Sequence, residues 1–201
     1  MKKIIALILV IGCMLSLASC SLFGDNNTEQ PDDSHAIPEI QAKVDASAPK
    51  GADITVTFTT NLGVLNGSYK AVYNEDGTAT VEYSYEKFNT IGADSNGELK
   101  STVTGTATVN ADGSVIGNLT NDGLTAVSFD LQLDEAKLSN VAINAGILKA
   151  DVKAADTGSV LGVALNYDVQ LTVATGTNGL TSMTVAYTTA SGNVEIVTVY
   201  N

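Results

Sequence analysis

The chain has 201 residues, with 22 acidic residues against 10 lysines and no arginine, which gives a formal net charge of −12 at pH 7. Nucleic acids and anionic lipid surfaces are bound by clustered lysine and arginine, so this composition argues against both as electrostatic partners. With one histidine and two cysteines in the whole chain, a zinc site or a histidine-assisted nucleophile has too few residues to be built.

The first 20 residues have the three parts of an export signal. Lys2 and Lys3 form a positive start, residues 4–17 are mainly apolar, and the small residues Ala18 and Ser19 precede Cys20. The apolar stretch is too short and wrongly flanked for a stable transmembrane helix. We therefore interpret residues 1–19 as a signal peptide.

The end of this signal, Leu17-Ala18-Ser19-Cys20, resembles the lipobox of bacterial lipoproteins. The resemblance implies that Cys20 carries a diacylglycerol thioether with palmitate-like chains and becomes the new N-terminus. Each buried methylene contributes about 0.8 kcal/mol, so two or more chains anchor a protein firmly. The implied location is extracytoplasmic, on the cell membrane or on an outer membrane if the host has one. Val10-Ile11-Gly12-Cys13 fits the motif loosely, but cleavage there would leave a very short apolar region.

The remainder divides into a tether and one domain. Residues 20–36 are mostly polar, with repeated Asp, Asn and Ser and few apolar residues, and predict a lipidated N-terminus followed by a flexible tether. His35 lies there, and we interpret it as a solvated linker residue. Residues 37–201 are predicted to form a single all-β domain. Because Cys13 leaves with the signal and Cys20 is lipidated, no disulfide is expected.

Polarity alternates with a period of two through most of this domain, as in strands with one buried face. The alternating segments are 40–44, 54–58, 69–73, 79–85, 103–109, 127–133, 148–152, 165–173, 183–187 and 194–200. Asn74–Gly77 and Asn110–Gly113 have the composition of hairpin turns. The sequence thus predicts an antiparallel meander of roughly 9–11 strands, closed either as an open or half barrel or as a two-sheet sandwich. Short helical turns at most are expected, near 134–138 and 156–159, with a β-bulge at Gly146.

No catalytic, metal-binding or cofactor-binding residue is predicted. Glu82 and Glu86 share a strand face but stand four residues apart, about 13 Å, which is too far for a glycosidase pair. Asp130 and Asp134 have the same spacing. The Asn-x-Asp-Gly turns could supply oxygen ligands for calcium, but we favour ordinary turns, because neither segment has the closing glutamate of an EF-hand.

Four tyrosines form the remaining candidate site. Tyr69, Tyr73, Tyr83 and Tyr85 flank one predicted hairpin, on the apolar faces of its strands. One interpretation is a ligand cavity lined by tyrosine. The other, which we favour, is cross-strand aromatic packing inside the core.

The sequence therefore favours a non-enzymatic module that binds a ligand or partner at the cell envelope. Its expected partners are the membrane, through the lipid on Cys20, and a protein or a hydrophobic small molecule. One alternative is a carrier of a lipid or other hydrophobic ligand in a β-sheet cavity, and another is a carboxylate-based hydrolase. Oligomeric state and envelope type stay open.

Replacing the anchor residue tests the first part of this interpretation. Cys20→Ala should prevent lipid attachment and move the protein out of the membrane fraction, as measured by fractionating cells and blotting each fraction. Cys13→Ala is the matched control and should leave the distribution unchanged. Processed Cys20→Ala protein that stayed in the membrane fraction would contradict lipidation at this residue.

Overall fold

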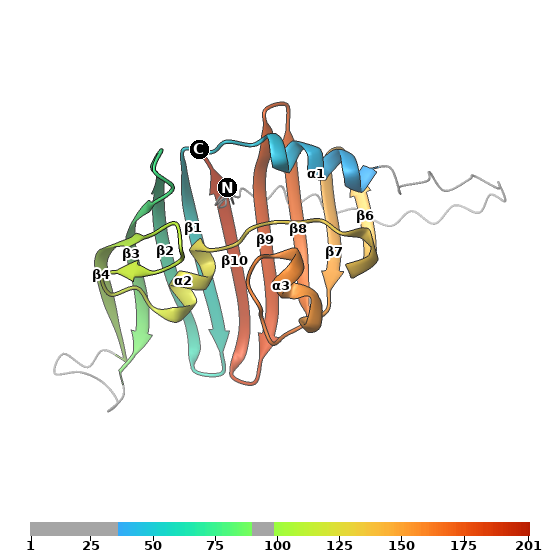
Figure 1. Ribbon diagram of the computed structural model, residues 1–201. Coiled ribbons are helices and arrows are strands. Elements are labelled where there is room, and N and C mark those ends of the chain that lie inside the picture. The colour runs from blue at the N-terminus through green and yellow to red at the C-terminus, as the bar shows by residue number, and fades with distance from the viewer. Residues whose placement is uncertain (1–35, 90–98) are drawn as a thin grey trace.

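A computed structural model describes residues 36–89 and 99–201, which contain ten strands in one antiparallel sheet (Figure 1). The order across the sheet is β5-β4-β3-β2-β1-β10-β9-β8-β7-β6. The strands are β1 (Gly51–Thr60), β2 (Gly63–Tyr73), β3 (Ala79–Phe88), β4 (Lys100–Val109), β5 (Val115–Ile116), β6 (Leu138–Asn144), β7 (Ile147–Val152), β8 (Val169–Gly176), β9 (Gly179–Thr189) and β10 (Gly192–Tyr200). The predicted all-β antiparallel fold is confirmed.

The helices are few and lie on one face of the sheet, as Figure 1 shows. They are α1 (Ala36–Ala46), α2 (Asn121–Val127), η2 (Glu135–Lys137), η3 (Ala154–Asp156) and α3 (Thr157–Val160). The helical turns predicted near 134–138 and 156–159 are confirmed. Among the described residues, none of these helices has the length and apolar character needed to span a bilayer.

The path of the chain starts and ends in the middle of the sheet. β1 and β10 pair along their whole lengths, with Ile54 opposite Thr198 and Val56 opposite Ile196. From β1 the chain winds outward to β5 at one edge, crosses the covered face through residues 117–137, and returns from β6 at the other edge. The meander therefore consists of two halves joined at their centre by the first and last strands.

The crossing segment corrects one predicted strand. Residues 127–133 alternate as predicted, with Phe129 and Leu131 buried at 1% and 3% exposure, but they belong to no sheet. The backbone N–H of Asp130 donates to the carbonyl of Leu161, and that of Gln132 donates to Val160. Alternating burial indicates an extended chain with one buried side, and it does not show whether that chain belongs to a sheet.

The first element is a helix where alternation predicted a strand. Ile37, Ile40 and Val44 are buried on one face of α1, with the spacing of a helix. Because Ile40 and Val44 are four residues apart, they fit both periods, and Ile37 decides between them. The Gln41 side chain accepts from the Leu133 N–H at 2.6 Å, which ties α1 to the crossing segment.

The two hairpin turns predicted from the sequence are present. Asn74–Gly77 joins β2 to β3 and Asn110–Gly113 joins β4 to β5, with the glycines at φ +83° and +82°. The bulge predicted at Gly146 is wrong, because this residue lies in the turn between β6 and β7. The shift of alternation there comes from reversal of the chain, and the irregular pairing lies between Ser139 and Ala142.

The core lies between the sheet and the layer of helices and crossing chain. From the sheet, Ile54, Val81, Leu148, Leu171, Val185 and Ile196 point into it, and all are at most 2% exposed. Phe129 and Leu161 close it from the other layer. The two-sheet sandwich is therefore wrong, because the second layer is made of helices and extended chain and the single sheet keeps an open face.

The layer around α3 depends on one buried hydroxyl. Thr157 Oγ1 accepts from the Leu165 N–H at 2.8 Å and lies 3.0 Å from the carbonyl oxygen of Ala154. Thr157→Val should lower the free energy of unfolding by about 1–3 kcal/mol, because a buried N–H loses its partner. Thr157→Ser keeps the hydroxyl and should cost less. Urea unfolding of both variants measures the difference, and equal stability would contradict this role.

Candidate functional site

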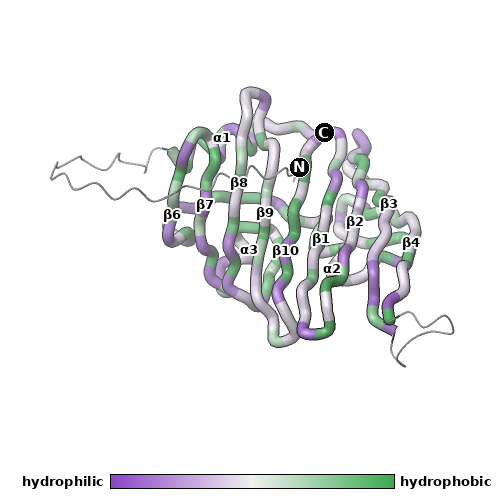
Figure 2. Tube along the Cα trace, turned by 180° about the vertical axis from the view of Figure 1, so that it is seen from behind, coloured by the Kyte–Doolittle hydropathy of each residue, from purple (hydrophilic) through white to green (hydrophobic). Residues whose placement is uncertain are grey.

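The face of the sheet turned away from the helices carries mostly polar side chains and extends across the strands. Figure 2 views the molecule from this side, with the strands in front of α1, α2 and α3. Within residues 36–89 and 99–201, no element packs on this face. On β4 this face carries Thr102, Thr104, Thr106 and Thr108. They lie opposite the polar residues Glu86, Ser84, Glu82 and Thr80 of β3. Such a face can contact a large partner.

One row of side chains crosses this open face at right angles to the strands. The pairing places Thr57 of β1 opposite Glu195 of β10, and Glu195 opposite Ala186 of β9. Ala186 is opposite Gln170 of β8, and Gln170 is opposite Asp151 of β7. We call these five residues the polar row. Neighbouring members are separated by one strand spacing, about 4.7–4.9 Å, so the row is about 19 Å long.

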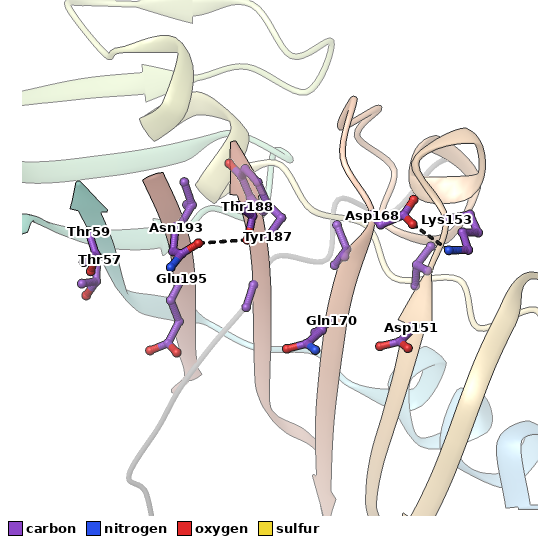
Figure 3. Close-up of a pocket in the computed structure, with 14 residues that line it drawn as sticks. Thr57, Thr59, Asp151, Lys153, Asp168, Gln170, Tyr187, Thr188, Asn193 and Glu195 are labelled. Carbon is purple, nitrogen blue, oxygen red and sulfur yellow. Dashed lines mark hydrogen bonds and ion pairs between the residues drawn. The ribbon is translucent and has the colours of Figure 1, made fainter. Parts of the chain in front are cut away.

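The polar row forms the floor of a hollow of about 700 Å³ (Figure 3). Ala186 has only a methyl group between the longer side chains of Glu195 and Gln170, which leaves space above the sheet. The polar residues that complete the lining are Thr59, Thr188, Asn193, Lys153 and Asp168. Val152, Val169, Tyr187 and Val194 complete the lining, so the hollow combines hydroxyl, amide and carboxylate groups with about as much apolar surface.

Several of these groups are held by neighbours. Lys153 Nζ lies 2.6 Å from the Asp168 carboxylate, which also accepts from the Ala154 N–H at 3.0 Å. The hydrogen bond from Lys153 lowers the pKa of Asp168, with a smaller contribution from the Ala154 N–H. The Asp151 carboxylate accepts from the Asn140 amide at 2.6 Å.

Two side chains of the hollow have no such partner. Glu195 and Gln170 make no side-chain hydrogen bond or ion pair with another described residue, whereas the Asn193 side chain accepts from the Thr188 hydroxyl at 2.9 Å. The Glu195 carboxylate and the Gln170 amide, on either side of Ala186, are therefore the groups best placed to bind a ligand.

The four predicted tyrosines do not surround one cavity. Tyr69 and Tyr83 are buried in the core at 3% and 7% exposure, and Tyr83 stacks on Tyr85 with ring centroids 6.0 Å apart. Gly105 gives Tyr83 its space, since a Cβ there would lie 2.4 Å from the phenol oxygen. Tyr73 lines a cleft that is separate from the hollow and lies on the covered side of the sheet, and the other three tyrosines line neither cavity.

The turn residues considered for calcium are used within their own turns. Asp76 Oδ1 accepts from the N–H and hydroxyl of Thr78, at 3.0 and 2.7 Å. Asp112 does the same with Ser114, at 2.9 and 2.6 Å. In the part of the chain that the structure describes, no group of three or more His, Cys, Asp or Glu side chains could hold a metal ion.

Other residues singled out from the sequence lie elsewhere. Glu86 accepts from the Asn66 N–H at 2.8 Å and pairs with Lys100 at 3.7 Å, so it is engaged across the open face. Cys20, with the predicted signal and tether, lies outside the described residues, as does His35.

No protein-family model and no curated protein sequence matches the chain. The candidate site is therefore defined by geometry.

Sequence reasoning did not find the polar row. Each member except Ala186 falls at a polar position or flank of a predicted strand, but the row exists only through the pairing between strands. The join of β1 to β10 links Thr57 to Glu195, 138 positions apart in the numbering, and no local pattern encodes such a register.

The ion pair at the edge of the hollow leads to a prediction about pH. Lys153→Met should raise the pKa of Asp168, because the hydrogen bond from Lys153 is the main cause of its lowering. Because this pKa is lowered in the folded protein, the pair contributes stability above the ordinary Asp range and loses it as pH falls through the folded pKa. Carbon-detected NMR titration of the carboxylates measures the change. Lys149→Met is the control, and an unchanged Asp168 midpoint in Lys153→Met would contradict the pairing.

Proposed function

We propose that this protein is a lipid-anchored, non-enzymatic binding module of the cell envelope that holds an extended polar polymer on its open sheet face. The observation that carries the proposal is the polar row, which runs across five neighbouring strands over the floor of a hollow of about 700 Å³. A row perpendicular to the strands presents evenly spaced groups, which suits a linear chain of repeating units better than a compact molecule.

The lining favours a ligand that is neutral or bears amines. Glu195, Asp151 and Asp168 bring three carboxylates to the hollow, against Lys153 as the basic side chain of the lining. Lys153 is already paired with Asp168 at 2.6 Å. An anionic polymer would meet net repulsion there, whereas hydroxyl, amide and ammonium donors could bond to Glu195 and to the carbonyl of Gln170.

The same geometry supports binding without catalysis. Glu195 and Asp151 stand three strand spacings apart along the polar row, about 14 Å, whereas glycosidase carboxyl pairs are about 5–9.5 Å apart. Asp168 is occupied by Lys153 and by the Ala154 N–H. The carboxylates of the hollow are thus arranged as separate hydrogen-bond acceptors along a surface.

The predicted anchor gives this surface its place. A lipid on Cys20, followed by the predicted tether of residues 20–36, would hold the domain outside the membrane and near envelope polymers. Each contact of a polar polymer with an exposed sheet is weak, but many domains on one membrane would bind one long chain with high avidity.

Filling the hollow tests the proposal. Ala186→Trp should lower co-sedimentation with purified cell-wall polymer from the host by about tenfold, because the indole occupies the space between Glu195 and Gln170. The fold should tolerate this change, since Ala186 faces away from the core. The measurement is the bound fraction against polymer concentration, using peptidoglycan and neutral wall polysaccharide as separate probes.

Thr104→Trp is the matched control, with the same added bulk on the open face of β4, away from the hollow. It should bind as the unchanged protein does. Equal losses in the two variants, or binding by neither probe to the unchanged protein, would contradict the proposal.

A further inference from the structure

The β4 side of the sheet ends in a strand edge that is open over most of its length (Figure 1). β5 pairs only with the last two residues of β4, and no other described strand lies beside β4 on that side. The Asn110 N–H donates to the Ser114 carbonyl, so the backbone of Asn110 faces β5. Alternate residues of a strand face the same way, so the outward N–H and C=O groups belong to Thr102, Thr104 and Thr106.

The chain after β5 limits this edge at its far end. A Cβ at Gly117 would lie 3.0 Å from the carbonyl oxygen of Thr106 and 3.2 Å from the Ala107 Cβ. The segment that leaves for the covered face therefore passes close to Thr106. The part of β4 that a further strand could reach begins at Lys100 and is centred near Val103.

The opposite edge of the sheet is built differently. In β6 the pairing with β7 shifts between Ser139 and Ala142, and Asn140 has φ +52°. The Asn140 amide also donates to the Asp151 carboxylate. Such a bulge disrupts the regular ladder and prevents pairing with another chain. β4 has no such device, because it pairs with β3 in ten consecutive positions without a shift.

The composition of β4 suits a second copy of this acidic chain. With a net charge of −12, two copies repel each other through most of their charged groups. β4 contains no carboxylate, and its one charged residue is Lys100. Lys100 pairs with Glu86 at 3.7 Å and donates to the Val64 carbonyl. Two copies can therefore meet at β4 without bringing acidic side chains into contact.

We propose that β4 pairs antiparallel with β4 of a second copy of this chain, about a two-fold axis at Val103. This register places the two Val103 side chains opposite each other on the covered face, each beside its own Tyr85. It is favoured because side chains come closest in such a non-hydrogen-bonded pair. Thr102 then lies opposite Thr104 of the second copy, and these two pairs exchange about four backbone hydrogen bonds.

The axis is perpendicular to the sheet, so the open faces of both copies lie on the same side. Two hollows would face one direction across a continuous sheet. The interface is narrow, and confinement to one membrane would favour it by raising the effective concentration of the chain. The pairing itself does not depend on the polymer proposed for the open face.

A cysteine at the axis tests the pairing in membranes that contain the full-length protein. Val103→Cys should form a disulfide-linked dimer on oxidation with copper phenanthroline, because opposed Cα atoms about 4.5 Å apart suit a disulfide. Dimers are counted on a non-reducing gel, above the background of the unchanged protein. Ala142→Cys, on the exposed side of β6, is the control and should stay monomeric. No dimer in Val103→Cys, or an equal amount in Ala142→Cys, would overturn the proposal.

Charge reversal across the pairing tests its register. In the Val103→Cys chain, Thr102→Lys with Thr104→Lys places lysines opposite each other, whereas Thr102→Lys with Thr104→Glu places opposite charges there. Both positions are exposed, so both chains should fold. The cross-linked fraction should be about fivefold lower with two lysines. Random collision predicts the reverse order, because two lysines reduce the negative charge of the chain. Equal fractions, or a larger fraction with two lysines, would overturn the proposal.

Discussion

The pairing of β1 with β10 is the contact on which the rest of the structure depends. It joins Ala52–Thr60 to Gly192–Tyr200 in one continuous register, and it lies at the centre of the ten-stranded sheet. Each half of the molecule is a meander whose neighbours in space are neighbours in sequence. Only this central pairing, together with the crossing chain, turns the halves into one sheet with one core. The entropy of closing so long a loop is offset only when the core beneath it is buried as well.

Because of this arrangement only one face of the sheet is buried. The residues that stabilise the fold and the residues of the candidate binding site therefore lie on different faces. The helices and the crossing chain cover one face, so apolar residues such as Ile54 and Leu171 are enclosed there. The other face carries mostly polar side chains and can vary without loss of core packing.

Local patterns predicted much of the fold. Alternation found most of the strands, and the Asn-x-Asp-Gly turns at 74–77 and 110–113 were found because their glycines need a positive φ. Ile40 and Val44 misled because a spacing of four fits a strand and a helix alike. Residues 127–133 were wrongly predicted as a strand, because alternation indicates an extended chain and does not show which segment that chain is hydrogen-bonded to. The polar row was beyond reach, since it is defined by register between strands distant in sequence and by the smallness of Ala186.

The central position of β1 has a mechanical consequence. If the domain is anchored through Cys20 and holds a polymer, as proposed, force enters at its N-terminal end and reaches the sheet through α1 and β1. β1 is bonded along both sides, to β2 and to β10. Force along this strand loads two ladders of hydrogen bonds in shear, so many bonds must break at once. At an edge strand the same force would load only one ladder. A lipid anchor joined to the centre of the sheet would thus be held by two ladders instead of one.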